Sequence, residues 1–228
     1  QWFMLYNFVP TGRGKEIIEC DLSPDEREDL LLVLWERIMN KEAHQPIEVL
    51  STAPQLGRIA RTCNNDASGE EDLSIFPTHF SNARLPEGMK DLASFIGGCG
   101  AGRFYLAIEP NGDIYPCVFF PHTPEVCLGN IRSCDLDHLW RSSRVLYQLR
   151  TRSLLKGNCG SCSNQDVCGG CRARAKGYFD DYLAPDPGCI KNQDAWCSLT
   201  QDGPLEHSHL LISPILPAPS SDSENGVV

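Results

Sequence analysis

Hydrophobic positions divide the first fifty residues into a strand, a helix and a second strand. Residues 2–9 and 47–50 are apolar runs of strand length. Between them, residues 23–26 (Ser-Pro-Asp-Glu) form a capping box with proline at the first helical position, and apolar residues then recur at helical spacing. We therefore expect a helix from Pro24 to about Lys41, in a strand–helix–strand unit typical of a parallel α/β fold.

The middle of the chain predicts a hairpin followed by a long helix. In residues 104–109 the side chains alternate between two faces, and residues 111–112 are Asn-Gly, a strong signal for a tight hairpin turn. Residues 114–115 resume a strand. Farther on, residues 135–150 place leucines and a tryptophan on one broad face, which predicts a helix.

Other stretches lack such patterns. Residues 64–88 are polar and irregular, which predicts an insertion or mobile loop, and a short helix is expected at residues 87–96. Periodicity ends after Cys189. The prolines and serines of residues 198–228 predict a disordered tail.

Composition narrows the classes of protein to consider. With 228 residues, 41% of them hydrophobic, the chain can bury one good core or two small ones. Its formal net charge is −10 and it has no basic stripe, which argues against a nucleic-acid partner. No apolar run approaches the roughly eighteen residues of a membrane span. Because a strand follows Gln1 directly, we expect the sequence to be the C-terminal part of a longer protein.

Twelve cysteines carry the strongest chemical signal. Cys189 follows an Asp-Pro-Gly turn, and the predicted hairpin brings Cys99 close to Cys117. Reduced thiols in this number indicate the cytoplasm. The spacing Cys-x2-Cys-x5-Cys-x2-Cys lets thiolates of one loop converge on a single centre, and its members are Cys159, Cys162, Cys168 and Cys171.

The spacing favours an iron-sulfur centre, and two other interpretations of the cysteines, zinc ligands and disulfides, fit it less well. Zinc ribbons also contain Cys-x2-Cys pairs, but their pairs are normally about fifteen to twenty residues apart, and here five residues intervene. Disulfide scaffolds are typically short secreted domains, and this chain has an ordinary share of apolar residues.

The complete order of cysteines resembles the seven-cysteine SPASM region of radical SAM enzymes. That order is Cys-x12-Gly-x4-Cys, then the four-cysteine run, then a last cysteine, and the two-residue gap before the sixth cysteine is similar to that of the haem-biosynthesis-like members. The resemblance implies one or two auxiliary 4Fe-4S clusters. One would be held by Cys159, Cys162, Cys168 and Cys189. The other would be held by Cys99, Cys117 and Cys171, with its fourth position open or filled locally, for instance by Cys127 or Cys134.

The resemblance extends to the N-terminal half. Residues 9–14 (Val-Pro-Thr-Gly-Arg-Gly) and 53–58 resemble loops of the partial barrel of the same group. The implied fold class is α/β, the C-terminal end of a partial (β/α) TIM-like barrel followed by a small cysteine-rich α+β SPASM domain. The expected boundaries are residues 1–98 for the barrel part, 99–197 for the SPASM domain and 198–228 for the tail.

Three arginines are candidate electrostatic residues. Arg13, in the first loop, is a candidate contact for the cofactor or for substrate carboxylates, and an ion pair with Glu16 is an equal alternative. Arg172 is expected to lie near the cluster thiolates and to raise the cluster's reduction potential. Arg174 is expected to be a cation on a helix surface.

The implied function is that of the iron-sulfur part of a radical SAM oxidoreductase or maturase. Its clusters would transfer electrons or bind substrate during radical modification of a tetrapyrrole or a peptide. The full-length protein would use S-adenosylmethionine and an electron donor such as a ferredoxin or flavodoxin. The Cys-x3-Cys-x2-Cys motif that cleaves S-adenosylmethionine is absent from this chain. A non-catalytic iron-sulfur electron-transfer or scaffold protein and a zinc-stabilised interaction module are the alternatives.

Overall fold

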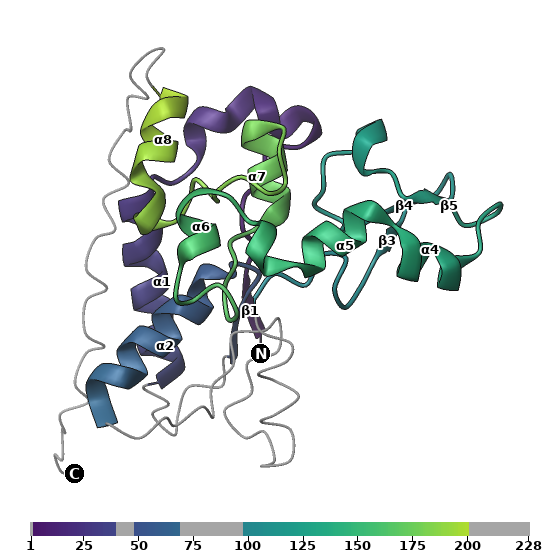
Figure 1. The fold of residues 1–228 in the computed structure, drawn as a ribbon. Coiled ribbons are helices and arrows are strands. Elements are labelled where there is room, and N and C mark those ends of the chain that lie inside the picture. The colour runs from purple at the N-terminus through teal and green to yellow at the C-terminus, as the bar shows by residue number, and fades with distance from the viewer. Residues whose placement is uncertain (1, 40–47, 69–97, 201–228) are drawn as a thin grey trace, which may run out of the picture.

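The computed structural model describes residues 2–39, 48–68 and 98–200 (Figure 1). Strands β1 (Trp2–Leu5) and β2 (Glu48–Ser51) pair in parallel, with Met4 opposite Leu50. Between them the chain forms the 3-10 segment η1 (Gly12–Cys20) and the helix α1 (Pro24–Met39). The expected strand–helix–strand unit is confirmed, and the predicted end of the helix beyond Met39 lies outside the described residues.

The start of α1 is held by the capping box that the sequence predicts. The Ser23 backbone N–H donates to Glu26 Oε2 at 2.9 Å, and the Glu26 N–H donates to Ser23 Oγ at 3.2 Å. Two amide groups that the first turn would leave without partners are thereby satisfied.

Replacing Ser23 by alanine is expected to lower the free energy of unfolding by about 1 kcal/mol, because the Glu26 amide then loses its acceptor. Urea unfolding of both proteins measures this difference. Serine-to-alanine exchange at Ser198, whose exposed hydroxyl bonds only within its own helix, serves as the control. Equal midpoints for the Ser23→Ala protein and the original chain would contradict the role of the box.

A second helix, α2 (Gln55–Ser68), was not predicted. It replaces the loop expected at residues 53–58 and the first residues of the irregular stretch expected at 64–88. Its apolar positions are few: Leu56, Ile59, Ala60 and Cys63 recur at helical spacing, and they pack in one core with Leu31, Leu34, Trp35 and Ile38 of α1. The remainder of the predicted loop and the short helix expected at residues 87–96 lie outside the described residues.

The predicted hairpin is present with shorter strands. Strands β3 (Ala107–Ile108), β4 (Asp113–Tyr115) and β5 (Gly129–Asn130) form an antiparallel sheet in the order β3-β4-β5. Gly112, with φ of +94°, donates to Glu109 O at 2.8 Å and closes the turn. The predicted first strand is too long, because the chain folds back on itself at residues 100–105 instead.

The helix predicted at residues 135–150 is broken in two. Its parts are α4 (Leu136–Ser142) and α5 (Arg144–Arg150), with Asp135 capping the first. Ser143 is extended between them, and its hydroxyl accepts from the Leu146 N–H at 3.4 Å. The two helices lie beside the small sheet on one side of the molecule (Figure 1).

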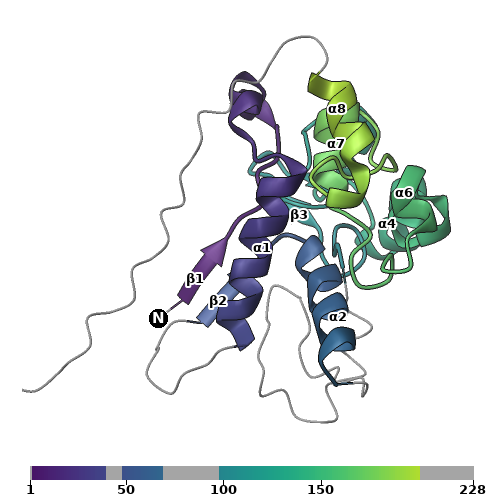
Figure 2. The ribbon, with the colours of Figure 1, turned by 90° about the vertical axis from the view of Figure 1, so that its left-hand side faces the viewer.

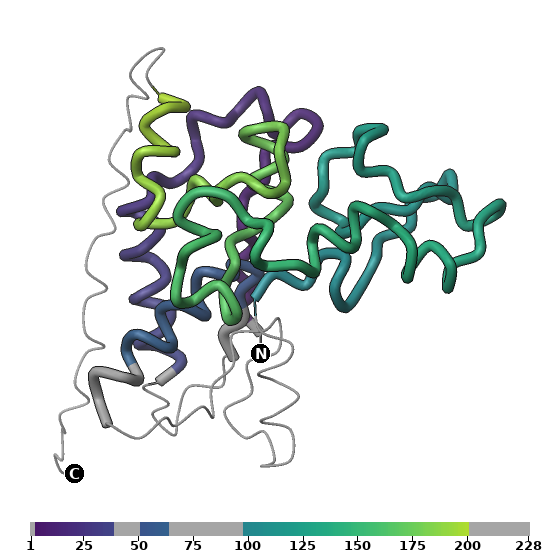
Figure 3. The backbone as a smooth tube through the Cα atoms, viewed as in Figure 1, coloured from purple at the N-terminus to yellow at the C-terminus, as the bar shows by residue number. Residues whose placement is uncertain are grey.

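The remaining elements are short and wrap around the parallel unit. The expected loss of periodicity after Cys189 is wrong, because a helix follows that residue. Trp196 in this helix packs edge-on against Tyr178, with the two ring centroids 6.2 Å apart. From the side, this helix, α8 (Gln193–Thr200), and the helix α7 (Arg172–Phe179) stand next to α1 (Figure 2). Figure 3 follows the backbone through these helices and the segments that connect them. The elements are η3 (Pro124–Val126), η4 (Arg152–Leu154), α6 (Gly157–Ser161), α7 (Arg172–Phe179), η5 (Ile190–Asn192) and α8 (Gln193–Thr200).

Candidate metal centres

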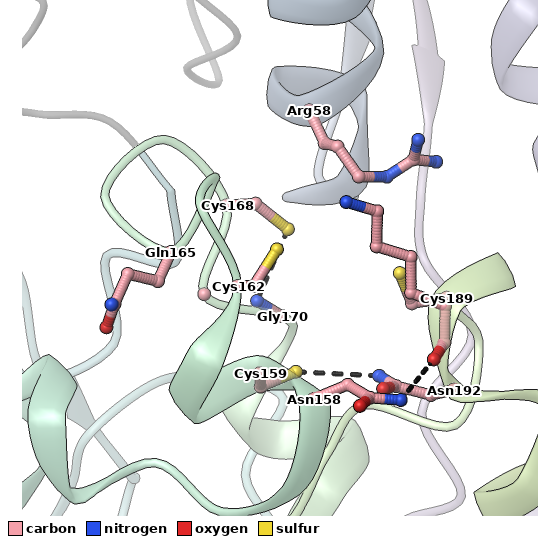
Figure 4. A pocket seen from close by; sticks show the side chains of 11 residues that line it. Arg58, Asn158, Cys159, Cys162, Gln165, Cys168, Gly170, Cys189 and Asn192 are labelled. Carbon is pink, nitrogen blue, oxygen red and sulfur yellow. Dashed lines mark hydrogen bonds between the residues drawn. The ribbon is translucent and has the colours of Figure 1, made fainter.

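Four cysteines from two separate stretches line one cavity (Figure 4). Helix α6 and the loop after it supply three of them, and the turn before η5 supplies the fourth. The cavity encloses about 320 Å³, including the space open to solvent. The four are Cys159, Cys162, Cys168 and Cys189.

The sulfurs of this cavity are surrounded by hydrogen-bond donors, as the sulfurs of cluster ligands are. Three of the four accept from an N–H group at 3.3–3.5 Å. The pairs are Gly170 N to Cys168, Asn164 N to Cys162 and the Asn192 side-chain amide to Cys159.

Cations also face the four thiols. Arg58 and Lys191 line the cavity, and Arg172 Nη2 lies 3.9 Å from Cys159 Sγ. Burial alone would lower the pKa of Arg58, but Glu28 and the nearby cysteine sulfurs raise it above its ordinary value. The cavity can therefore offset the negative charge of a centre held by thiolates.

Three more cysteines lie together in a second place. Cys99, Cys117 and Cys171 are buried in one core cluster. Cys99 precedes the 100–105 turn, Cys117 follows β4, and Cys171 caps the start of α7. The Cys99 N–H donates to Cys168 O at 3.2 Å, so the two groups of cysteines are joined directly by the backbone.

Burial favours the neutral form of these thiols. It raises the pKa of Cys168 and Cys171, and it raises that of Cys117 and of Cys189 to about 11. A metal centre that binds here must displace the thiol protons, so its binding depends on pH and releases protons.

The remaining candidates lie elsewhere. The Cys127 thiol donates to Gly129 O at 3.7 Å, and Cys134 lies beside Gly129. Arg13 is not among the residues that line the cavity, and its side chain is 91% exposed and pairs with Glu16 at 3.5 Å. All twelve thiols are free, which excludes the disulfide interpretation for this structure. Among the described residues, no group of three or more His, Cys, Asp or Glu side chains is arranged to hold a single metal ion.

Comparison with known proteins identifies the cysteine-rich part. Residues 99–172 match the SPASM family, an iron-sulfur cluster-binding domain. The chain belongs to the radical SAM/SPASM family. Its SPASM domain contains both groups of cysteines except for Cys189, which lies beyond the matched residues. No solved structure matches the chain.

The relatives include haem synthases, a pre-heme d1 synthase and a mycofactocin maturase. The chain is 33% identical to the AdoMet-dependent heme synthase of Methanosarcina barkeri over 82% of the chain and 47% of that protein. It is 34% identical to the pre-heme d1 synthase of Dinoroseobacter shibae over 82% and 44% of the two chains. It is 35% identical to the mycofactocin maturase of Mycobacterium ulcerans over 48% of the chain and 30% of that protein. The chain thus spans about half the length of the haem-synthesis relatives.

The two arginines at the start of α7, Arg172 and Arg174, are both buried. Arg172 donates to the carbonyls of Tyr182 and Ala184 at 3.1 and 2.8 Å and holds Nη2 against Cys159, between the two groups of cysteines. The expectation that Arg174 lies on a helix surface is wrong. Its side chain is 0% exposed and forms ion pairs with Asp21 at 2.7 Å and Asp186 at 3.1 Å.

Asp186 joins the SPASM domain to the N-terminal half, a role that the sequence did not predict. One carboxylate oxygen accepts from the Cys171 N–H and from Gln55 Nε2 of α2, both at 2.7 Å. The other accepts from the Gly188 N–H at 2.9 Å and from Arg174. Asp186 therefore fixes the turn before Cys189 relative to Cys171 and to α2.

None of the described helices is long and apolar enough to cross a membrane.

Proposed function

We propose that the chain binds two auxiliary 4Fe-4S clusters, which transfer electrons or bind substrate during radical modification of a tetrapyrrole or a peptide. The first would be held by Cys159, Cys162, Cys168 and Cys189, and the second by Cys99, Cys117 and Cys171. The observation that carries the proposal is the single cavity lined by four cysteines, with N–H donors and cations around their sulfurs.

The protein's own residues would hold the sulfurs of these centres in place and offset their negative charge. When bound, such a cluster supplies one-electron chemistry. The N–H groups of Gly170 and Asn164 hold two of the sulfurs in place, and Arg58 and Arg172 stabilise negative charge on the thiolates. Both effects raise the reduction potential relative to a site without donors.

For the whole protein we infer the reaction class of its relatives. Their names describe haem synthesis and mycofactocin maturation, which supports a tetrapyrrole or peptide substrate. Cleavage of S-adenosylmethionine would require a further cluster, whose Cys-x3-Cys-x2-Cys motif this sequence lacks. A ferredoxin or flavodoxin in the cytoplasm is the expected electron donor.

The parallel β1-α1-β2-α2 segment supports the end of a partial (β/α) barrel in residues 1–98, ahead of the SPASM domain at 99–197. The loop that carries Arg13 follows β1 directly, at the edge of parallel strands where such folds bind ligands. Contact of Arg13 with cofactor or substrate is part of this proposal.

Metal analysis of the chain, purified and reconstituted without oxygen, tests the cluster sites. We expect about eight irons and a similar amount of sulfide per chain, and about four irons after Cys189→Ala, because the first site then loses a ligand. Cys197→Ala, which removes an exposed thiol, should leave the iron content unchanged. An equal iron content in the Cys189→Ala protein, or zinc without sulfide, would contradict the proposal.

A further inference from the structure

The second group of cysteines brings three thiols together, whereas a 4Fe-4S cluster has four irons to ligate. If the proposed second cluster is correct, one iron must face another group of this chain or an external ligand. Of the two cysteines suggested by the sequence, Cys127 packs against the core cluster of the other three but its thiol bonds elsewhere, and Cys134 packs against a different cluster. Cys127 bonds toward Gly129, and Cys134 lies beside that same glycine.

The backbone around Tyr105 turns its side chain toward the group of three cysteines. After Cys99 the chain folds back, so that the Gly102 N–H donates to Tyr105 O at 3.2 Å and Ala101 forms a bridge with Tyr105. The ring lies over Gly100, where a Cβ atom would come within 2.6 Å of Tyr105 Cε1. Glycine at position 100 is therefore what admits the ring next to Cys99.

The phenolic oxygen of Tyr105 lies against one of the three thiols, that of Cys117. It donates to Cys117 Sγ at 3.8 Å, and the ring packs on the core cluster that contains all three cysteines.

We propose that the phenolic oxygen of Tyr105 is the fourth ligand of the three-cysteine site. Formation of the iron–oxygen bond replaces the O–H bond, and the proton leaves to solvent together with those of the three thiols, without any change in oxidation state. The positive charge of a bound metal stabilises the anionic form of each ligand, as it does for buried cysteines.

Three variants of the full chain, reconstituted without oxygen, test this assignment. Tyr105→Phe should lose the phenolate-to-iron charge-transfer absorption and convert the second cluster to a three-iron form with its own EPR signal. Tyr105→Cys should restore the iron content but not the phenolate-to-iron absorption, because a thiolate replaces the phenolic oxygen. Tyr182→Phe is the matched control, because Tyr182 packs on the same core but bonds to Gln148.

Cys117→Ala separates this assignment from the proposed second cluster. If Cys117→Ala lowers the iron content by about four while Tyr105→Phe keeps the absorption and EPR spectra of the original chain, the cluster exists and Tyr105 is not its ligand. A change in reduction potential alone in Tyr105→Phe would also overturn the ligand role. If Cys117→Ala leaves iron unchanged, the second cluster itself is absent.

Discussion

Replacing Asp186 by alanine is expected to lower the free energy of unfolding by about 3–5 kcal/mol, because the buried guanidinium of Arg174 then loses one of its two carboxylate partners and keeps only Asp21. Arg174 and Asp186 are both 0% exposed. The change also removes the acceptor of the Cys171 and Gly188 N–H groups and of Gln55. Together with Arg174, four buried hydrogen-bond donors would thus lose the carboxylate that accepts from all of them.

The charge on Asp186 is present at neutral pH. Burial alone would raise the pKa of this carboxyl, but Arg174 and the N–H groups of Cys171 and Gly188 hold it below its ordinary value. A carboxylate with a lowered pKa in the folded protein contributes stability above its unfolded value of about 3.9. That stability is lost as the pH falls through the lower, folded value.

Urea unfolding of iron-loaded protein without oxygen measures the loss. Asp186→Asn keeps the shape of the side chain and should retain part of the stability, which provides a second value if the alanine variant does not fold. Arg141→Ala is the control, because its ion pair with Asp137 has side chains that are 76% and 70% exposed, and its loss should cost less than about 1 kcal/mol. Equal midpoints for Asp186→Ala and Arg141→Ala would contradict the network.

The sequence could not predict this network, because its members are far apart in the chain. Arg174 and Asp21 are separated by 153 positions, and Gln55 and Asp186 by 131. On a short helix with the pattern Arg-Ala-Arg-Ala, the sequence does not distinguish a buried arginine from an exposed one. Burial here depends on how the SPASM domain lies against α1 and η1.

Features set by neighbouring residues were predictable. The capping box at Ser23 and the Asn111-Gly112 turn are local hydrogen-bond patterns, and both are present. The break at Ser143 was missed because apolar positions continue through it, although a serine that can cap the next turn was a usable signal. Tyr105 was placed in a strand by alternation, and the fold-back that turns it toward Cys117 was not visible in that pattern.

Removing the iron is expected to unfold most of residues 98–192 while α1 and α2 keep more of their protection. The helices in that segment have five to eight residues, and isolated helices of this length are marginal in water. Seven buried or half-buried cysteines would line the two proposed metal sites, and they take positions that apolar side chains would occupy in an ordinary core. Bound metal would therefore supply a large part of the stability of this segment.

Hydrogen exchange measured by mass spectrometry before and after anaerobic chelation tests this expectation. Amides of residues 98–192 should exchange at least about 100-fold faster in the iron-free chain, which corresponds to about 2.7 kcal/mol of lost local stability. Amides of α1 are the internal control, because Leu31, Leu34, Trp35 and Ile38 pack on α2 in a core that contains none of the proposed cluster ligands. Unchanged exchange throughout residues 98–192 would mean that the SPASM domain folds without its clusters, and that its short helices hold one another in place.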